Sequence, residues 1–207
     1  EDRNRFKSLV NELKLNQPEN SIVYSHNEAK KIVKKLDFPV VIRPSYVLGG
    51  RAMRIVHNSD ELNDYFKTEL TQSNSAILID KFLNDAKEID VDAISDGKNV
   101  FIAGILEHIE EAGIHSGDSA CSFPPQTINK KLLNYINDVT TKIAKKLKVK
   151  GCINIQFAVK ENKVYLIEVN PRASRTIPFI AKSIGKPLAK IATKAMLGKS
   201  IKKIKLE

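Results

Sequence analysis

VYLIEVNPRASRT, residues Val164 to Thr176, decides the fold, together with the apolar run CINIQFAV just before it, residues Cys152 to Val159. Apolar and polar residues alternate in both runs, which is typical of β-strands. Only residues 160–163 lie between the two runs. The two strands are therefore predicted to form a hairpin.

The register of this hairpin follows from its faces, because cross-strand partners lie on the same side of a sheet. A three-residue loop keeps like with like, pairing Gln156 with Glu168, Asn154 with Asn170, Phe157 with Ile167 and Ile155 with Val169. A two-residue loop would pair Gln156 with Ile167 and mix the faces. The three-residue loop is therefore preferred.

The polar face of the predicted hairpin carries oxygen ligands. Gln156, Glu168 and Asn170 supply an amide, a carboxylate and a second amide at adjacent positions, a set that suits Mg²⁺. Arg172 and Arg175 follow just past the strand end. Positive charge so close to a metal carboxylate indicates an anion between them, and phosphate is the obvious candidate. The alternative is a structural hairpin with a polar outer face, which is the simpler interpretation of Glu168 taken alone.

EVNPRASRT, preceded by QFAV, closely resembles the ATP-grasp superfamily, and specifically the large subunit of carbamoyl phosphate synthetase. Two further blocks extend the resemblance over nearly all of the 207 residues: RPSYVLGGRAM, from Arg43 to Met53, and EHIEEAGIHSGDSACSFP, from Glu107 to Pro124. GGRAM is similar to the second, carbamate-phosphorylating half of that subunit. The resemblance implies an α/β fold of the α+β kind, with ATP between two lobes.

Residues 1–79 are expected to hold the N-terminal helix and the smaller lobe with its glycine-rich lid. Residues 80–207 are expected to hold the larger lobe with the nucleotide and metal site, and residues 80–88 the hinge. Apolar periodicity predicts helices over residues 2–14 and 128–147, and Ser25 and Ser59 are predicted to cap two more. Alternating or buried runs predict strands over residues 38–43, 53–56, 76–82, 88–95 and 100–109. Residues 199–207 are interpreted as a linker.

The resemblance also assigns a nucleotide site, made of Arg43, Gly49, Gly50, Lys81, Leu83, Glu88, Gly113, Ile114, His115, Ser116, Gln156 and Glu168. In that assignment Arg43 contacts phosphate, the glycine pair is a mobile lid, Lys81 and Leu83 contact adenine, and Glu88 binds the ribose. Many synthetases have His in place of Lys81, a change of little weight if the contact is through backbone. The role of Arg51 stays open.

The implied metal ligands are Gln156, Glu168 and Asn170, and the implied catalytic residues are Arg172 and Arg175. Asp90 and Asp92 alternate along one predicted strand. They are interpreted as solvated acids and left out of the site, because outward-facing acids on a strand usually contact water.

The implied activity is that of an ATP-dependent ligase: phosphoryl transfer to carbamate, forming carbamoyl phosphate, by the glutamine-hydrolysing synthetase of arginine and pyrimidine biosynthesis. The implied cofactors are ATP and Mg²⁺ or Mn²⁺, with two ions per site. The implied partners are the remainder of the large subunit and its glutaminase small subunit. Two alternatives keep the fold and change the acceptor: another ATP-grasp ligase, or the half that phosphorylates bicarbonate.

The chain carries 34 Lys and Arg against 24 Asp and Glu, a net charge of +10. This charge makes a basic nucleic-acid-binding module the remote alternative. The lysines are spread along predicted helices without interleaved aromatic residues, so solvated faces are the preferred interpretation and nucleic acid is not expected. There is no run of about 18 apolar residues and no signal-peptide pattern, which favours a cytoplasmic protein without membrane contact. We expect an excised domain that binds ATP with weak or absent turnover.

Overall fold

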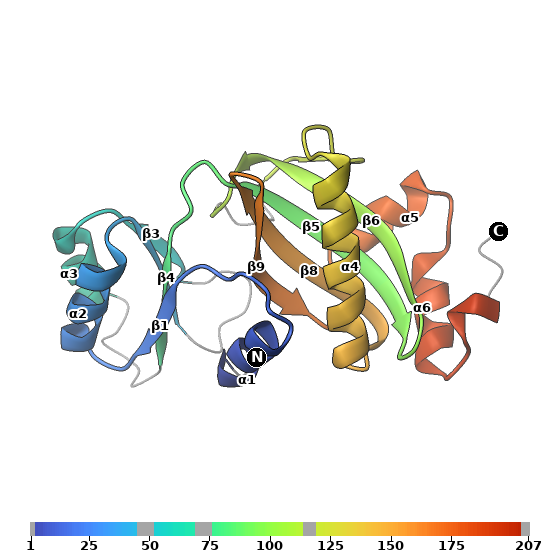
Figure 1. Ribbon diagram of the computed structural model, residues 1–207, viewed down its shortest axis with the longest axis horizontal. Helices are drawn as coiled ribbons and strands as arrows, with labels where there is room; N and C mark the ends of the chain where they lie inside the picture. The colour runs from blue at the N-terminus through green and yellow to red at the C-terminus, as the bar shows by residue number, and fades with distance from the viewer. Residues whose placement is uncertain (1–2, 45–51, 69–75, 114–118, 204–207) are drawn as a thin grey trace.

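The computed structural model describes residues 3–44, 52–68, 76–113 and 119–203. The described residues form two antiparallel sheets that lie side by side, with helices packed against their faces (Figure 1). The predicted α/β fold with two lobes is therefore confirmed. None of the helices within those ranges has both the length and the apolar character that a membrane span requires.

The sheet of the smaller lobe has the strand order β1-β4-β2-β3. Its strands are β1 (Asn20–Val23), β2 (Val40–Pro44), β3 (Arg54–Val56) and β4 (Ile77–Lys81). Two helices, α2 (His26–Leu36) and α3 (Ser59–Thr68), share a core with this sheet. Within that core Ile42, Leu62 and Tyr65 are almost fully buried.

Local capping signals start both helices of this lobe. The backbone N–H of Glu28 donates to Ser25 Oγ at 3.2 Å, and the Glu28 carboxylate accepts from the N–H just before Ser25, so the predicted capping interaction is confirmed. At α3 the cap lies one residue earlier than predicted. There the N–H of Glu61 donates to Asn58 Oδ1 at 2.9 Å. Asn caps helices at least as well as Ser, so Ser59 becomes the first helical residue.

The larger sheet has the strand order β7-β6-β5-β8-β9. Its strands are β5 (Lys87–Asp96), β6 (Val100–Glu111), β7 (Cys121–Ser122), β8 (Lys150–Lys160) and β9 (Lys163–Asn170). Helices α1 (Arg3–Glu12) and α4 (Lys130–Lys146) cover one face, and α5 (Ile177–Ser183), α6 (Leu188–Met196) and the 3-10 helix η1 (Ile201–Lys203) cover part of the other (Figure 1).

The two faces of the larger sheet differ because side chains alternate along each strand. Ile89, Val91 and Phe157 point into the core beneath α1 and α4. On the opposite face, Ile94 and Leu106 pack against α5 and α6. The rest of that face carries polar side chains instead. We call this polar part the polar face, and its residues are Glu88, Asp90, Asp92, Asn154, Gln156, Glu168 and Asn170.

The β8–β9 hairpin confirms three of the four predicted pairs and corrects the loop. The pairs Gln156–Glu168, Asn154–Asn170 and Ile155–Val169 are all present, whereas Phe157 pairs with Leu166 rather than Ile167. The loop has only two residues, which both adopt positive φ: Glu161 at 50° and Asn162 at 60°. A bulge between Gln156 and Phe157 then shifts the register by one residue and restores like-with-like pairing. The prediction of a three-residue loop was therefore wrong.

The two ends of the chain both pack against the larger sheet. Leu9 and Val10 of α1 are buried in its core, although they precede the smaller lobe in sequence. The predicted division after residue 79 stays a prediction. At the other end, the predicted linker is wrong at Ile201, which is 5% exposed and donates its N–H to Asp96 at 2.9 Å.

The two-residue turn of the hairpin makes a prediction about stability. Replacing Asn162 with Val places a β-branched residue at φ 60°, and we expect a loss of about 1–2 kcal/mol in the free energy of unfolding. Asn162→Gly is the matched control, because it also removes the Asn162 side chain yet tolerates positive φ. Urea unfolding followed by circular dichroism measures both variants, and equal stability of the two would contradict the assigned turn.

Candidate functional site

Two rows of polar side chains cross the polar face. The first row runs over β5, β8 and β9 through Asp90, Gln156 and Glu168, and the second through Asp92, Asn154 and Asn170. Residues directly opposite each other on neighbouring strands have Cβ atoms about 5 Å apart. The structure therefore brings the three predicted metal ligands, Gln156, Glu168 and Asn170, side by side, and adds three residues that the sequence interpretation left out.

Asp90 and Asp92 are buried, with 4% and 0% exposed, so the prediction that they are solvated was wrong. Asn154 lies between them and donates through Nδ2 to Asp90 Oδ1 at 3.3 Å and to Asp92 Oδ1 at 3.2 Å. β5 is an interior strand, flanked by β6 and β8, so neighbouring side chains shield both carboxylates. Burial raises the pKa of Asp92, although hydrogen bonds from Thr176, Ser174 and Asn154 oppose the rise.

His108 of β6 was missed by the sequence interpretation. Its Nε2 lies 3.1 Å from Asp90 Oδ2, and its Nδ1 lies 3.0 Å from Ser119 Oγ, which in turn donates to Glu110 at 2.6 Å. Burial lowers the pKa of His108, but the bond to Asp90 and the charge of Glu88 outweigh this effect, so its pKa is raised. The sequence did contain a signal for His108, because the alternation in EHIEE puts His108 and Glu110 on one face of the strand.

Glu88, the predicted ribose ligand, is 8% exposed and lies on the polar face with Asp90 and Glu168. Burial raises its pKa to about 6. The charge of His108 and a hydrogen bond from the backbone of Gly113 oppose this rise, whereas the charges of Asp90 and Glu168 add to it. A raised pKa is common at functional sites because burial and like charges gather there.

Gly113 follows the end of β6 and lies close to the smaller lobe. It adopts φ +108°, and a Cβ built at this position would lie 2.6 Å from Phe82 Cε2 and 3.2 Å from Ile55 Cδ1. Both the backbone conformation and the close approach therefore require glycine. Since Ile55 belongs to β3, its closeness to Gly113 shows that the end of β6 lies against the smaller lobe.

Lys81 and Leu83, the predicted adenine contacts, lie where β4 ends. The Lys81 N–H donates to Glu19 O at 2.7 Å, and its ammonium donates to the carbonyls of Asp37 and Phe38 at 3.1 and 3.2 Å. The Leu83 carbonyl accepts from the N–H of Ala86 at 3.3 Å. These bonds hold the crossing from the smaller to the larger lobe against the smaller sheet.

Arg43, the predicted phosphate contact, lies in the smaller sheet. Its Nε and Nη2 both lie 3.1 Å from Asp80 Oδ2, and the two side chains are 16% and 9% exposed. The pair fixes the guanidinium on β2 and leaves its Nη1 without a partner among the described residues. Such a geometry suits a guanidinium that binds an anion with its remaining N–H groups.

Arg172 and Arg175, the predicted catalytic residues, are exposed on the segment between β9 and α5. The backbone N–H of Arg172 donates to Asn170 O at 2.8 Å, and its Nη2 donates to Asn170 Oδ1 at 3.3 Å. The structure thus places one arginine beside a predicted metal ligand. The predicted site residues Gly49, Gly50, Ile114, His115 and Ser116, together with Arg51, lie outside the described residues.

The donor chemistry of the polar face fits a hard cation. Within the described ranges, no group of three or more His, Cys, Asp or Glu is arranged to hold a metal ion. The predicted set differs in kind, because it has one carboxylate, Glu168, flanked by the amides of Gln156 and Asn170 on adjacent strands. Amide and carboxylate oxygens are the ligands that Mg²⁺ takes, usually with water and substrate phosphate completing the shell.

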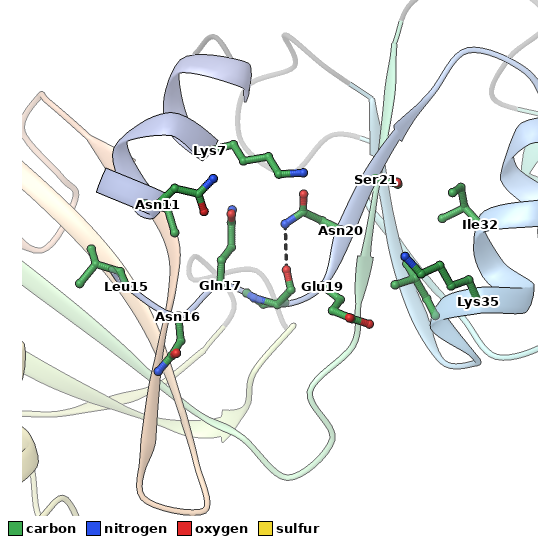
Figure 2. A pocket seen from close by; sticks show the side chains of 13 residues that line it. Lys7, Asn11, Leu15, Asn16, Gln17, Glu19, Asn20, Ser21, Ile32 and Lys35 are labelled. Atoms are coloured by element: carbon green, nitrogen blue, oxygen red, sulfur yellow. Dashed lines mark hydrogen bonds between the residues drawn. The ribbon is translucent and has the colours of Figure 1, made fainter. Parts of the chain in front are cut away.

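A cavity of about 370 Å³ lies elsewhere, between α1, the segment that follows it, and α2 (Figure 2). Lys7, Asn11, Gln17, Asn20 and Lys35 are among its lining residues. No predicted site residue lines it. We place the candidate site on the polar face instead, because the carboxylates and amides converge there.

The comparisons with known proteins agree with this fold. Residues 2–204 match the family model of the carbamoyl-phosphate synthase L chain, ATP binding domain. The chain belongs to this family. It is 55% identical over 205 residues to the carbamoyl phosphate synthase large chain, C-terminal section, of Aquifex aeolicus, and 56% identical over 205 residues to the carbamoyl phosphate synthase large chain of Archaeoglobus fulgidus. Both alignments cover 99% of this chain.

The chain spans 38% and 19% of the lengths of these two curated relatives. As a carbamoyl-phosphate synthase large-chain domain it shares its fold with more distant proteins. The biotin carboxylase domain of Hydrogenobacter thermophilus 2-oxoglutarate carboxylase, solved in complex with MgADP, ADP and bicarbonate, superposes with a TM-score of 0.78 at 21% identity. That match covers 96% of this chain and 46% of the other. The predicted ATP-grasp fold and the predicted family are therefore confirmed.

The raised pKa of Glu88 makes a prediction about pH dependence. Because its pKa is about 6 in the folded protein and 4.5 ordinarily, the folded state binds more protons between these values, and stability falls as pH rises through this window. The expected loss is about 2 kcal/mol. The raised pKa of His108 has the same sign, so its loss comes as pH rises above 6.5.

Glu88→Gln is uncharged at every pH and should flatten the fall between pH 4.5 and 6. Urea unfolding at several pH values measures this effect, and Glu161→Gln, an exposed glutamate in the hairpin turn, is the control. An unchanged slope in Glu88→Gln would mean that other groups cause the pH dependence.

Proposed function

We propose that this domain binds ATP with Mg²⁺ and transfers the γ-phosphoryl group to carbamate, forming carbamoyl phosphate. The observation that carries the proposal is the register of β8 and β9. It sets Gln156 beside Glu168, with Asn170 in the next row and Arg172 and Arg175 directly after the strand. Membership of an ATP-dependent ligase family and identity to a C-terminal section support the choice of the carbamate-phosphorylating half.

Gln156, Glu168 and Asn170 would hold the metal, with two ions per site and Mn²⁺ as an alternative to Mg²⁺. When bound, the ions would neutralise negative charge on the phosphate groups. Arg172 and Arg175 would bind the phosphoryl group in transfer and the acceptor carboxylate. Since phosphoryl transfer depends mostly on positioning and charge neutralisation, no side chain needs to act as a covalent nucleophile.

The nucleotide would lie between the lobes, where Phe82 and Ile55 come close to Gly113. In this proposal Lys81 and Leu83 contact adenine, and Glu88 binds the ribose. Arg43 contacts phosphate with the N–H groups that Asp80 does not occupy. The nucleotide contacts of Gly49, Gly50, Ile114, His115 and Ser116 stay predictions. The MgADP complex of the structural neighbour supports ATP and Mg²⁺ as ligands of this fold.

The proposal extends to a larger assembly because the chain spans 38% of one relative and 19% of the other. Carbamate would be made elsewhere in the large subunit from carboxyphosphate and ammonia, and the glutaminase small subunit would supply the ammonia. The complete enzyme would serve arginine and pyrimidine biosynthesis in the cytoplasm. A closed site would protect carbamate from water.

The proposal is tested by isothermal titration calorimetry of ADP into this chain, with and without Mg²⁺. We expect Mg²⁺-dependent binding whose affinity falls about 100-fold or more in Glu168→Ala, because the only carboxylate of the ligand set is removed. Glu161→Ala, in the turn of the same hairpin, is the matched control and should bind like the wild type.

Binding that ignores both Mg²⁺ and Glu168 would contradict the metal site on the hairpin. Phosphate release by the complete large chain, as wild type and as Glu168→Ala, with bicarbonate or carbamate as acceptor then identifies the half. Loss of the bicarbonate-dependent release in Glu168→Ala, with the carbamate-dependent release kept, would overturn the choice of carbamate.

A further inference from the structure

Asp92 of the polar face anchors the segment between β9 and α5. This residue is fully buried on β5, and its carboxylate accepts hydrogen bonds from side chains on two other segments. Asn154 Nδ2 donates to Oδ1 at 3.2 Å, and the Thr176 hydroxyl donates to Oδ2. A buried carboxylate requires such donors, because leaving one unpaired is costly.

Thr176 belongs to the segment that carries the arginines. Ser174 and Thr176 stand on either side of Arg175, and their hydroxyl oxygens lie 2.7 Å apart. The Thr176 N–H also donates to Ser174 Oγ at 3.2 Å. Three bonds therefore close a small cluster around the backbone of Arg175 and fasten it to the centre of the larger sheet.

Thr176 gives up an alternative bond in order to reach Asp92. It is the N-cap residue of α5, a position at which a Thr hydroxyl normally accepts a backbone N–H of the first helical turn. Here the side chain makes no cap hydrogen bond. The start of α5 is held instead by the buried side chains of Ile177 and Ile180. The helix thus has its own apolar anchors, and the bond to Asp92 serves the segment before it.

We propose that Asp92 is a positioning residue, which fixes Arg175 against the transferring phosphoryl group through the hydroxyls of Ser174 and Thr176. This inference rests on the proposed function and adds to it. A carboxylate is a costly way to hold a loop that apolar side chains could cover. It suits a segment whose guanidinium must keep one position relative to the proposed metal ligands on β8 and β9, because small misplacements lower transfer rates strongly.

The test measures the contribution of the γ-phosphate to binding separately from that of the rest of the nucleotide. Calorimetry gives the dissociation constants of MgADP and of the Mg²⁺ complex of β,γ-imido-ATP, which is not hydrolysed. We expect Thr176→Val to weaken binding of the ATP analogue about tenfold, the size of one charge-assisted hydrogen bond, and to leave MgADP binding unchanged. Thr176→Ser keeps the hydroxyl and should bind like the wild type.

Arg175→Gln completes a double-mutant cycle. If Thr176 acts through Arg175, then Thr176→Val has no further effect in the Arg175→Gln background. Thr193→Val makes the same chemical change on α6, where the hydroxyl donates to Ala189 O at 2.9 Å, and should change neither affinity. Thermal unfolding verifies that each variant folds, and Ser174→Ala takes the place of Thr176→Val if that variant does not fold.

Four results would overturn the inference. Additive effects of Thr176→Val and Arg175→Gln would show that the hydroxyl acts independently of the arginine. Equal losses for MgADP and the ATP analogue would show a general structural effect. Wild-type protein that binds neither nucleotide would remove the proposed function and the inference with it, whereas normal binding that ignores Thr176 would remove the inference alone.

Discussion

The pairing of β5, β8 and β9 in one register is the constraint on which the rest of the structure depends. Side chains alternate along a strand, so one register puts the acids and amides on one face and Ile89, Val91, Ile155 and Phe157 on the other. A slip of one residue would place apolar side chains in the polar rows and polar ones under α4. The apolar core beneath α1 and α4 therefore enforces the geometry of the candidate site.

The hairpin shows how far the sequence could determine this register. Alternation of apolar and polar residues was sufficient to pair Gln156 with Glu168, because only that pairing keeps each face uniform. It was insufficient to give the loop length, because a bulge allows a two-residue turn and the same polar pairs to coexist. The turn depends on the backbone conformations of Glu161 and Asn162, which leave no trace in the polar pattern.

The acids of β5 show what the sequence pattern could not supply. Asp90 and Asp92 alternate like the residues of a solvated strand face, and local sequence gives no other signal. Their burial is a property of three strands, since it requires β6 and β8, and His108 and Asn154 come from positions remote in sequence. The family resemblance supplied the predicted ligand contacts, whereas the buried residues beside them appeared only once the strands were placed side by side.

The support also explains why acids can gather on this face. Asp90 and Asp92 accept from a shared amide, and a hydroxyl and an imidazole add further bonds, so both carboxylates are held although they are buried. Such bonds offset part of the cost of burial, while the raised pKa of Glu88 shows that repulsion and burial still oppose its charge. A cation at Glu168 would lower that cost further. Asp92, one of these acids, also accepts from Thr176 on the arginine segment. In the proposed site, the positions of the metal and of the guanidinium would therefore depend on one sheet.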